Sequence, residues 1–309
     1  MASLVNLKKT TAKNRLFREN SPLWGYLFIL PNFLSFLIFM AIPICYGLFI
    51  SFHEWDLLNV PVWVGVKNYV TLFTKDKLFK QSLLNTLLYS LYTIPVGLCC
   101  SLGLAVMLNS KRLRGVNFFR SVFFLPHVCT LAAVALVWKW FYNADFGVLN
   151  YLLSFVGIPA QKWLSDRNLA LPAIAFMMIW KGAGYNMVII LAGLQGIPRY
   201  LYEAASLDGA NSWQQFRKIT VPLLMPTLFF ILITLTINSF QVFDSVMVMT
   251  KGGPANTTTV YNYYLYQNAF SYFKMGYASA MGYILFAMVF IVTLLQMKFM
   301  GKRVSYEIG

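Results

Sequence analysis

The segment IPRYLYEAASLDGANSWQQFRKITVP, residues 197–222, lies between two long apolar runs and carries the signals of two short helices. Pro198 is suited to begin a helix, and Gly209 is suited to end it. Asn211 or Ser212 can cap a second helix, and the proline that closes the segment can begin the next apolar run. The pattern therefore predicts two short helices joined by a tight turn.

The first of these helices has a composition suited to contact with another protein. Ala204 and Ala205 keep its surface free of bulk, while Tyr202, Phe216 and Ile219 offer apolar contacts nearby. A helix with such a surface can occupy a groove in a partner protein. The residues alone leave a second interpretation open, in which the segment is an ordinary amphipathic connection that packs on its own chain.

The chain on both sides of this segment is unusually apolar. Of its 309 residues, 59% are hydrophobic and 11% are charged, whereas a soluble domain carries about 25% charged residues. This composition excludes a soluble globule, a disordered chain and a disulfide-stapled secreted module. A membrane-spanning helix needs about 20 apolar residues. Runs of this kind predict an all-α polytopic membrane protein with six spans, at residues 24–52, 85–108, 121–138, 170–197, 220–243 and 275–297.

The distribution of Lys and Arg predicts the orientation of these spans. Fifteen of the 25 basic residues lie in the N-terminal arm, the second-to-third and fourth-to-fifth connections and the C-terminal tail. The other three connections are longer, hold nine, and are diluted by acidic residues. Cytoplasmic loops carry the excess of Lys and Arg. We therefore expect a cytoplasmic basic arm (1–21), a transmembrane domain (22–300) in the cell membrane and a cytoplasmic tail (301–309).

The net charge of +15 does not indicate a nucleic-acid-binding protein, because the basic residues lie in short groups between uncharged runs and form no continuous basic face. An enzyme is not expected either. The chain has only His53 and His127, and it contains no H-E-x-x-H, no C-x-x-C and no G-x-x-x-x-G-K-[ST] sequence, so neither a metal site nor a nucleotide loop is predicted.

The segment 197–222 resembles the cytoplasmic EAA loop of binding-protein-dependent ABC importer permeases. The matching positions are Glu203, Ala204, Ala205, Asp208, Gly209, Ala210, Phe216, Ile219, Pro222 and Pro226. Residues 251–259 and 276–280 resemble the outer loop and last span of the carbohydrate-uptake branch, which includes maltose-type and glycerol-phosphate-type permeases. The extra N-terminal helices and large periplasmic insertion of the larger maltose subunit are missing here, so no function that depends on them is implied.

This resemblance implies a heteromeric sugar importer in the lipid bilayer. Its other parts are a second homologous permease, two cytoplasmic ATPase subunits and an extracytoplasmic solute-binding protein that delivers a sugar or oligosaccharide. In the family the EAA helices dock into a cleft of the ATPase, so this chain is expected to bind no cofactor, while ATP and Mg²⁺ bind in the ATPase subunits. The implied coupling residues are Tyr202, Glu203, Ala204, Ala205, Asp208, Gly209, Ala210 and Phe216.

Polar and aromatic residues inside the fourth and fifth spans are candidates for the substrate path, since polar groups in a membrane tend to face a cavity or another helix. A sugar needs aromatic platforms together with amide or carboxylate partners. The candidates are Trp180, Lys181, Gly182, Tyr185, Asn238, Ser239, Gln241 and Asp244. The resemblance matches Trp180, Gly182 and Tyr185 to a Trp-x-Gly-x-x-Tyr stretch of the maltose-type site. Val242 replaces a polar residue of that site, which implies a substrate other than maltose.

Several of these residues have a second interpretation. The aromatic side chains can pack, the amides can bond across helices, and the glycines can allow close helix contact. Lys181 can bind an anionic solute, pair with a carbonyl or Asp244, or extend into a water-filled path, and a structural or cavity role is favoured. For the whole chain, the alternative to an ABC permease is an ion-coupled secondary transporter. Such carriers place ionisable residues along the path and contain internal repeats, whereas here Lys181 alone lies well inside a span and no repeat is visible. A purely structural membrane scaffold comes third, because it leaves the helix pair unexplained.

Overall fold

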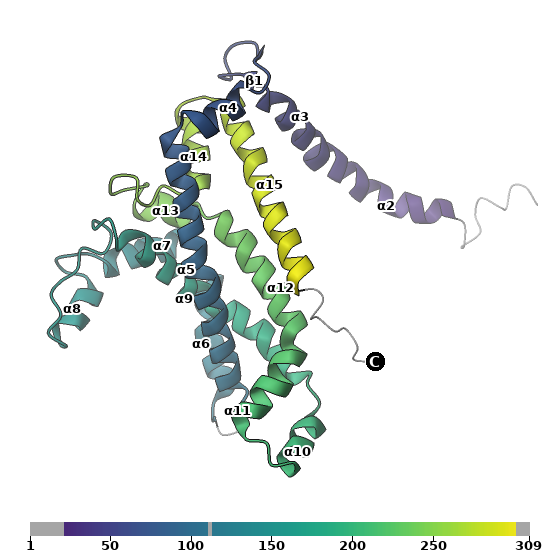
Figure 1. The fold of residues 1–309 in the computed structure, drawn as a ribbon, viewed down its shortest axis with the longest axis vertical. Coiled ribbons are helices and arrows are strands. Elements are labelled where there is room, and N and C mark those ends of the chain that lie inside the picture. Colours follow the sequence, from purple (N-terminus) through teal and green to yellow (C-terminus); the bar gives the residue numbers. More distant parts are fainter. Residues whose placement is uncertain (1–21, 111–112, 301–309) are drawn as a thin grey trace, which may run out of the picture.

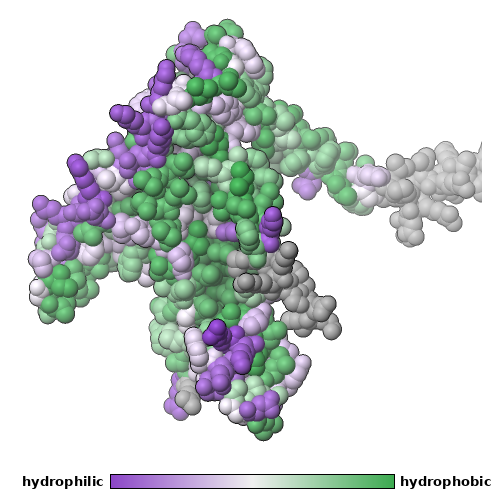
Figure 2. All heavy atoms as spheres, viewed as in Figure 1, coloured by the Kyte–Doolittle hydropathy of each residue, from purple (hydrophilic) through white to green (hydrophobic). Residues whose placement is uncertain are grey.

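The computed structural model describes residues 22–110 and 113–300, so the predicted N-terminal arm and C-terminal tail lie outside the described residues. Five of the described helices are long and apolar enough to cross a membrane, or six if one bent pair forms a single span. The exterior agrees with a membrane protein: hydrophobic residues cover the middle of the molecule, and hydrophilic residues gather along its upper left edge and at its lower end (Figure 2). The helical membrane architecture predicted from composition is confirmed.

The first span is a helical rod that stands away from the rest of the chain (Figure 1). It consists of α2 (Pro22–Phe36), a π-helical turn (Leu37–Ala41) and α3 (Ile42–Ser51). In its most apolar part only 6% of the residues are buried, against 50% in the corresponding part of the fourth predicted span. Only the α3 end of the rod packs against the last helix, α15 (Met275–Met300).

A small hairpin and a short helix join the first and second spans. β1 (His53–Glu54) pairs antiparallel with β2 (Val62–Trp63), and α4 (Lys67–Thr74) follows. The second span is α5 (Lys77–Leu108), which begins eight residues before the predicted start. The reason is the capping of its first turn by Asp76, whose carboxylate accepts a hydrogen bond from the backbone N–H of Phe79 at 2.8 Å.

The third predicted span, residues 121–138, is wrong as a single straight helix. The structure has α6 (Val116–Val128) and α7 (Leu131–Phe141), which meet at an angle of 100°. Cys129 and Thr130 have extended backbone between the two helices, with ψ angles of 142° and 140°. Composition does not register this break, because both halves are apolar. Pro126 is the only local signal, since it removes a backbone donor in the last turn of α6.

The fourth span, α9 (Ala170–Gln195), follows α8 (Val148–Ser154) and lies at the centre of the molecule, where it packs against α5 and α6. Gly184 allows the approach to α6, because a Cβ atom at this position would overlap the backbone carbonyl oxygen of Phe123. The predicted role of a glycine in close helix contact is therefore confirmed for Gly184.

The segment between the fourth and fifth spans contains α10 (Arg199–Leu207) and α11 (Ser212–Gln215). The prediction of a separate second short helix is wrong, because α11 continues through a π-helical turn (Phe216–Thr220) into α12 (Val221–Phe240). Together these form one helix of 29 residues, Ser212–Phe240. The wide turn precedes Pro222, which cannot donate a backbone hydrogen bond, so the helix passes the proline without ending.

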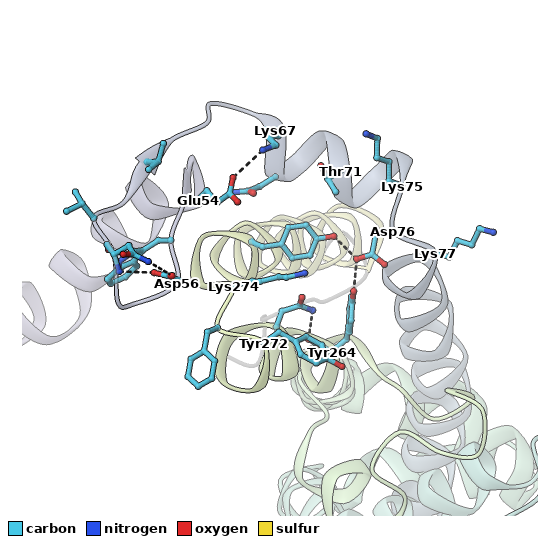
Figure 3. A pocket seen from close by; sticks show the side chains of 18 residues that line it. Glu54, Asp56, Lys67, Thr71, Lys75, Asp76, Lys77, Tyr264, Tyr272 and Lys274 are labelled. Carbon is cyan, nitrogen blue, oxygen red and sulfur yellow. Dashed lines mark hydrogen bonds and ion pairs between the residues drawn. The ribbon is translucent and has the colours of Figure 1, made fainter.

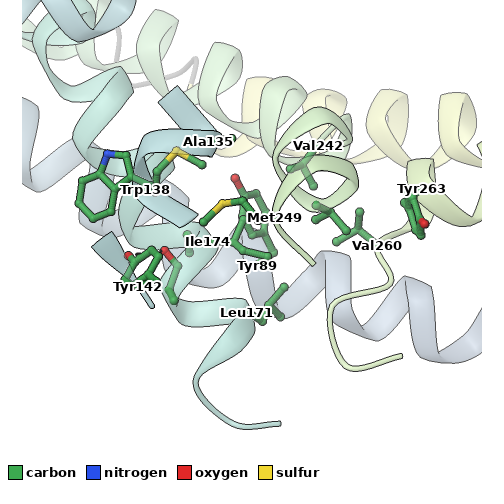
Figure 4. Close-up of a cluster of buried hydrophobic side chains, with 14 of the residues drawn as sticks. Tyr89, Ala135, Trp138, Tyr142, Leu171, Ile174, Val242, Met249, Val260 and Tyr263 are labelled. Atoms are coloured by element: carbon green, nitrogen blue, oxygen red, sulfur yellow. Dashed lines mark hydrogen bonds between the residues drawn. The ribbon is translucent and has the colours of Figure 1, made fainter. Parts of the chain in front are cut away.

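Beyond α12 the chain forms α13 (Asp244–Met249), α14 (Tyr261–Tyr266) and a π-helical turn (Gln267–Ser271) before α15. The connection between α13 and α14 is tied to α5: the Asn85 side-chain N–H₂ donates to the backbone carbonyls of Asn256 and Thr259, both at 2.9 Å. A cluster of buried side chains unites α5, α7, α9 and α13 at this level (Figure 4). It includes Tyr89, Trp138, Tyr142, Ile174, Val242 and Met249.

Candidate translocation cavity and coupling helix

A cavity of about 470 Å³ lies between α5, α9, α12 and the bend from α6 to α7. Seven of the eight residues that the sequence predicts for the substrate path line this one cavity: Lys181, Gly182, Tyr185, Asn238, Ser239, Gln241 and Asp244. The helix α12 ends at Phe240, three residues before the predicted end of the fifth span, so Gln241 caps α12 and Asp244 begins α13. The end of α12 therefore presents its polar groups at one wall of the cavity.

Trp180 is the predicted path residue that does not line the cavity. Its ring packs against that of Trp138, with centroids 5.3 Å apart, and its other side is exposed. Consecutive residues of a helix point about 100° apart, so the face of α9 that turns Lys181 and Gly182 to the cavity turns Trp180 toward α7. The packing interpretation of this tryptophan fits its position, and its path role stays a prediction.

Lys181 fixes the wall formed by the bend between α6 and α7. Its ammonium group donates a hydrogen bond to the backbone carbonyl of His127 at 3.0 Å. Because α6 ends at Val128, that carbonyl has lost its partner within the helix. Of the alternatives left open by the sequence, the structure has the one in which Lys181 pairs with a carbonyl. The His127 ring also stacks on Tyr185, with centroids 4.4 Å apart.

The opposite wall offers free polar groups. Within the described residues, the side chains of Asn238, Gln241 and Asp244 are exposed and take part in no hydrogen bond or ion pair. Two amides and one carboxylate therefore face the cavity with donors and acceptors available. Ser239 differs, because it is buried and its hydroxyl donates to the carbonyl of Thr236 at 2.9 Å.

Sequence reasoning missed five other polar residues in the cavity wall. They are Tyr89, Thr93, His127, Asn186 and Thr234. Thr234 could have been found by helical spacing, because it lies four residues before Asn238 and so shares its face. The place of His127 could not have been predicted, since it depends on the break after α6.

At one end of the molecule α10 stands out from the bundle (Figure 1). Tyr200, Glu203 and Leu207 are exposed and lie three or four residues apart, so they form one outer face of this helix. Leu207 is 90% exposed. The inner face packs on the chain itself, where Leu201 and Tyr202 contact the buried cluster that contains Leu194.

The eight predicted coupling residues divide between these two faces. Glu203, Ala204, Asp208 and Gly209 are exposed, and Ala205, Ala210 and Phe216 are half-buried. Tyr202 turns inward, and its hydroxyl is 2.9 Å from that of Thr220 at the base of α12. Sequence reasoning missed Tyr200 and Leu207, although the exposed apolar side chain of Leu207 is the feature that a partner protein could bury.

The turn after α10 holds it rigidly to α12. Gly209 has φ = +80°, a backbone conformation that glycine adopts without strain. The Asn211 side chain accepts from the N–H of Gln214, and the Gln214 side chain accepts from the N–H of Asn211, both at 2.9 Å. Gln215 donates to the hydroxyl of Ser206 at 2.8 Å. These hydrogen bonds tie the end of α10 to the start of the helix that lines the cavity.

Comparison with known proteins agrees with this geometry. Residues 28–306 match the family model described as "Binding-protein-dependent transport system inner membrane component". The chain is 41% identical to the probable ABC transporter permease protein YesP of Bacillus subtilis, over 96% of each chain. It is 36% identical to the lactose transport system permease protein LacF of Rhizobium radiobacter, over 88% of this chain and 92% of that protein.

A solved structure has the same fold. It is a bacterial alginate ABC transporter in complex with an alginate pentasaccharide-bound periplasmic protein, and one of its chains aligns with a TM-score of 0.77 and 26% identity, over 93% of this chain and 94% of that one. The match to the family model over most of the sequence, together with the relatives and the shared fold, shows that this chain belongs to the family of binding-protein-dependent transport system inner membrane components.

Proposed function

We propose that this chain is one of two homologous permease subunits of an ATP-driven importer, and that it forms half of the path for a sugar or oligosaccharide delivered by an extracytoplasmic solute-binding protein. The observation that carries the proposal is the cavity between α5, α9 and α12, whose wall presents the unpaired side chains of Asn238, Gln241 and Asp244. Amides and carboxylates are suited to the many hydroxyls of a sugar, and relatives named for sugar transport share most of the chain.

The proposed orientation follows from the charge distribution and the two ends of the molecule. We place α10 and both termini in the cytoplasm and the β1–β2 hairpin on the outer side. The α6–α7 pair then forms a single broken span, the third along the chain, which brings the number of spans to six. Two cytoplasmic ATPase subunits bind ATP and Mg²⁺, and the outer face of α10 docks on one of them. Closure of the ATPase pair then moves α12 through the rigid turn at Gly209.

Asn238→Leu tests the role of the cavity. This variant replaces an unpaired amide with an apolar group of similar size, so a hydroxyl bound there loses its partner, at a cost of about 1–3 kcal/mol. We expect sugar uptake by the complete importer to fall by about tenfold or more, with normal amounts of permease in the membrane. The measurement is the initial rate of uptake of labelled di- and oligosaccharides by intact cells.

Asn168→Leu is the matched control, because Asn168 is exposed in the connection between α8 and α9 and does not line the cavity. Uptake by this variant should equal that of the unmodified importer. Equal uptake by the Asn238→Leu variant, at equal permease levels, would show that the cavity is not the path.

A further inference from the structure

A second and larger cavity, of about 910 Å³, lies at the end of the molecule opposite α10. It is bounded by the β1–β2 hairpin, α4, the beginning of α5, α14 and the beginning of α15 (Figure 3). It shares no lining residue with the translocation cavity. Cargo held in the translocation cavity therefore does not touch it, and its role requires a separate explanation.

The cavity lies in water under the proposed orientation. Its wall includes the first residue of α5, a helix of 32 residues. At 1.5 Å per residue this helix is about 48 Å long, whereas the hydrocarbon core of a bilayer is about 30 Å thick. Because the apolar run of α5 covers residues 85–108, the end that projects beyond the hydrocarbon is the one that begins at Lys77, together with the hairpin beside it, and a soluble protein can reach both.

The three acidic residues in the lining are already engaged within the chain. Glu54 forms an ion pair with Lys67 at 3.2 Å. The Asp56 carboxylate accepts from two backbone N–H groups and the side chain of Asn59, and these hydrogen bonds lower its pKa. Asp76 caps α5 and also accepts from the hydroxyls of Tyr264 and Tyr277.

Three lysines of the lining are not engaged in this way. Within residues 22–110 and 113–300, the ammonium groups of Lys75, Lys77 and Lys274 have no hydrogen-bond or ion-pair partner. In Figure 3 the Lys274 side chain extends into the cavity toward Asp76, while Lys75 and Lys77 lie at its edge with their ammonium groups directed outward. The cavity and its edge therefore carry three free cationic donors and no free carboxylate, an arrangement that attracts anionic groups.

Apolar side chains complete the rim. Val60, Val62 and Phe273 all line the cavity and are more than half exposed. Phe273 has φ = +54°, a backbone conformation that is unfavourable for a bulky residue and that is often found at binding sites. Exposed valines do not assist the binding of a free sugar, whereas apolar contacts around charged pairs are typical of protein interfaces. The combination favours a protein partner over a sugar or an inorganic anion.

We propose that this outer cavity is a socket for an acidic loop of the solute-binding protein, whose carboxylates pair with Lys75, Lys77 and Lys274 while apolar residues beside them contact Val60 and Phe273. The proposal rests on the proposed function and adds to it the place and the chemistry of docking. Charge complementarity of this kind raises the rate of encounter and makes it dependent on salt.

The test uses the complete importer in nanodiscs of phosphatidylcholine, with the double variant Lys75→Gln and Lys274→Gln. ATP hydrolysis is measured against the concentration of the importer's own sugar-loaded binding protein. We expect the half-saturating concentration to rise about tenfold and to depend less on salt, with the basal rate and the maximal rate unchanged. Lys162→Gln is the control, because this exposed lysine of another outer connection does not line the cavity.

A second measurement uses a labelled octaglutamate peptide as the probe. The unmodified importer should bind it in a salt-dependent manner, and should not bind octaglutamine. The double variant should bind octaglutamate at least tenfold more weakly.

In the ATPase test, the double variant could still be stimulated normally by the binding protein, at an unchanged half-saturating concentration. That result would overturn the socket and leave the proposed function intact. Absence of stimulation in the unmodified importer would instead contradict the proposed function. An effect seen only in nanodiscs with phosphatidylglycerol would assign the cavity to a lipid headgroup and also overturn the socket.

Discussion

Replacement of Leu207 by aspartate is expected to separate the permease from its ATPase subunits. Leu207 is the most exposed apolar residue of the outer face of α10. In the proposed docking of α10, burial of this leucine in a groove of the ATPase contributes about 1.5–3 kcal/mol, and a carboxylate in the same place adds a desolvation cost. A total loss of about 3 kcal/mol corresponds to roughly a hundredfold weaker association. The measurement is co-purification of the ATPase subunits with the permease, together with uptake.

Leu58→Asp is the matched control for this prediction. Leu58 is 88% exposed, close to the 90% of Leu207, but it lies in the hairpin connection at the opposite end of the molecule. The same substitution there should leave ATPase association unchanged. If both variants retained the ATPase subunits equally well, the docking role of α10 would have to be abandoned.

Gly184→Leu is expected to prevent stable assembly of the helical bundle. A Cβ atom at Gly184 would already overlap the carbonyl oxygen of Phe123, and backbone cannot move aside as a flexible side chain can. The helices α6 and α9 would have to separate, at a cost of about 3 kcal/mol or more. We expect a large fall in the yield of folded protein in the membrane and in the midpoint of thermal unfolding in detergent.

Gly182→Ala provides the comparison, because no atom lies within 4 Å of the position that its Cβ would occupy. It should fold with the same yield and unfold at the same temperature as the unmodified protein. Normal yield and thermal stability in the Gly184→Leu variant would mean that α6 does not cross α9 as closely as the structure indicates.

Much of the fold could be predicted from composition because lipid selects long apolar helices. Five of the six predicted spans correspond to long helices. The failures have local causes. The third span breaks at Cys129 and Thr130, where neither residue type is a strong helix breaker. The start of α5 was placed too late because the polar first turns of that helix extend beyond the apolar run, and α11 was separated from α12 because Pro222 was read as a new beginning.

The site could be predicted only in part. Helical spacing grouped Asn238 with Gln241, and the structure brings both to one cavity. Trp180 lies beside this cavity and not in its lining, which a one-dimensional pattern of aromatic residues could not indicate, because it does not say which helix face is turned inward. Leu207 was missed because an apolar residue in an apolar chain carries no signal until its exposure is known. The outer cavity depends on contacts between residues about 200 positions apart, such as Asp76 and Tyr277, which no local pattern reports.

Cross-linking from α10 can establish whether this helix contacts an ATPase subunit. In a permease whose Cys45, Cys99, Cys100 and Cys129 are replaced by serine, single cysteines are introduced as Leu207→Cys and Leu58→Cys, and the intact importer is treated with a short thiol-to-amine cross-linker. We expect Leu207→Cys to join the permease to the ATPase subunit and Leu58→Cys not to do so. Labelling of Leu207→Cys by a membrane-impermeant reagent added outside intact cells, without a cross-link to the ATPase, would contradict this expectation.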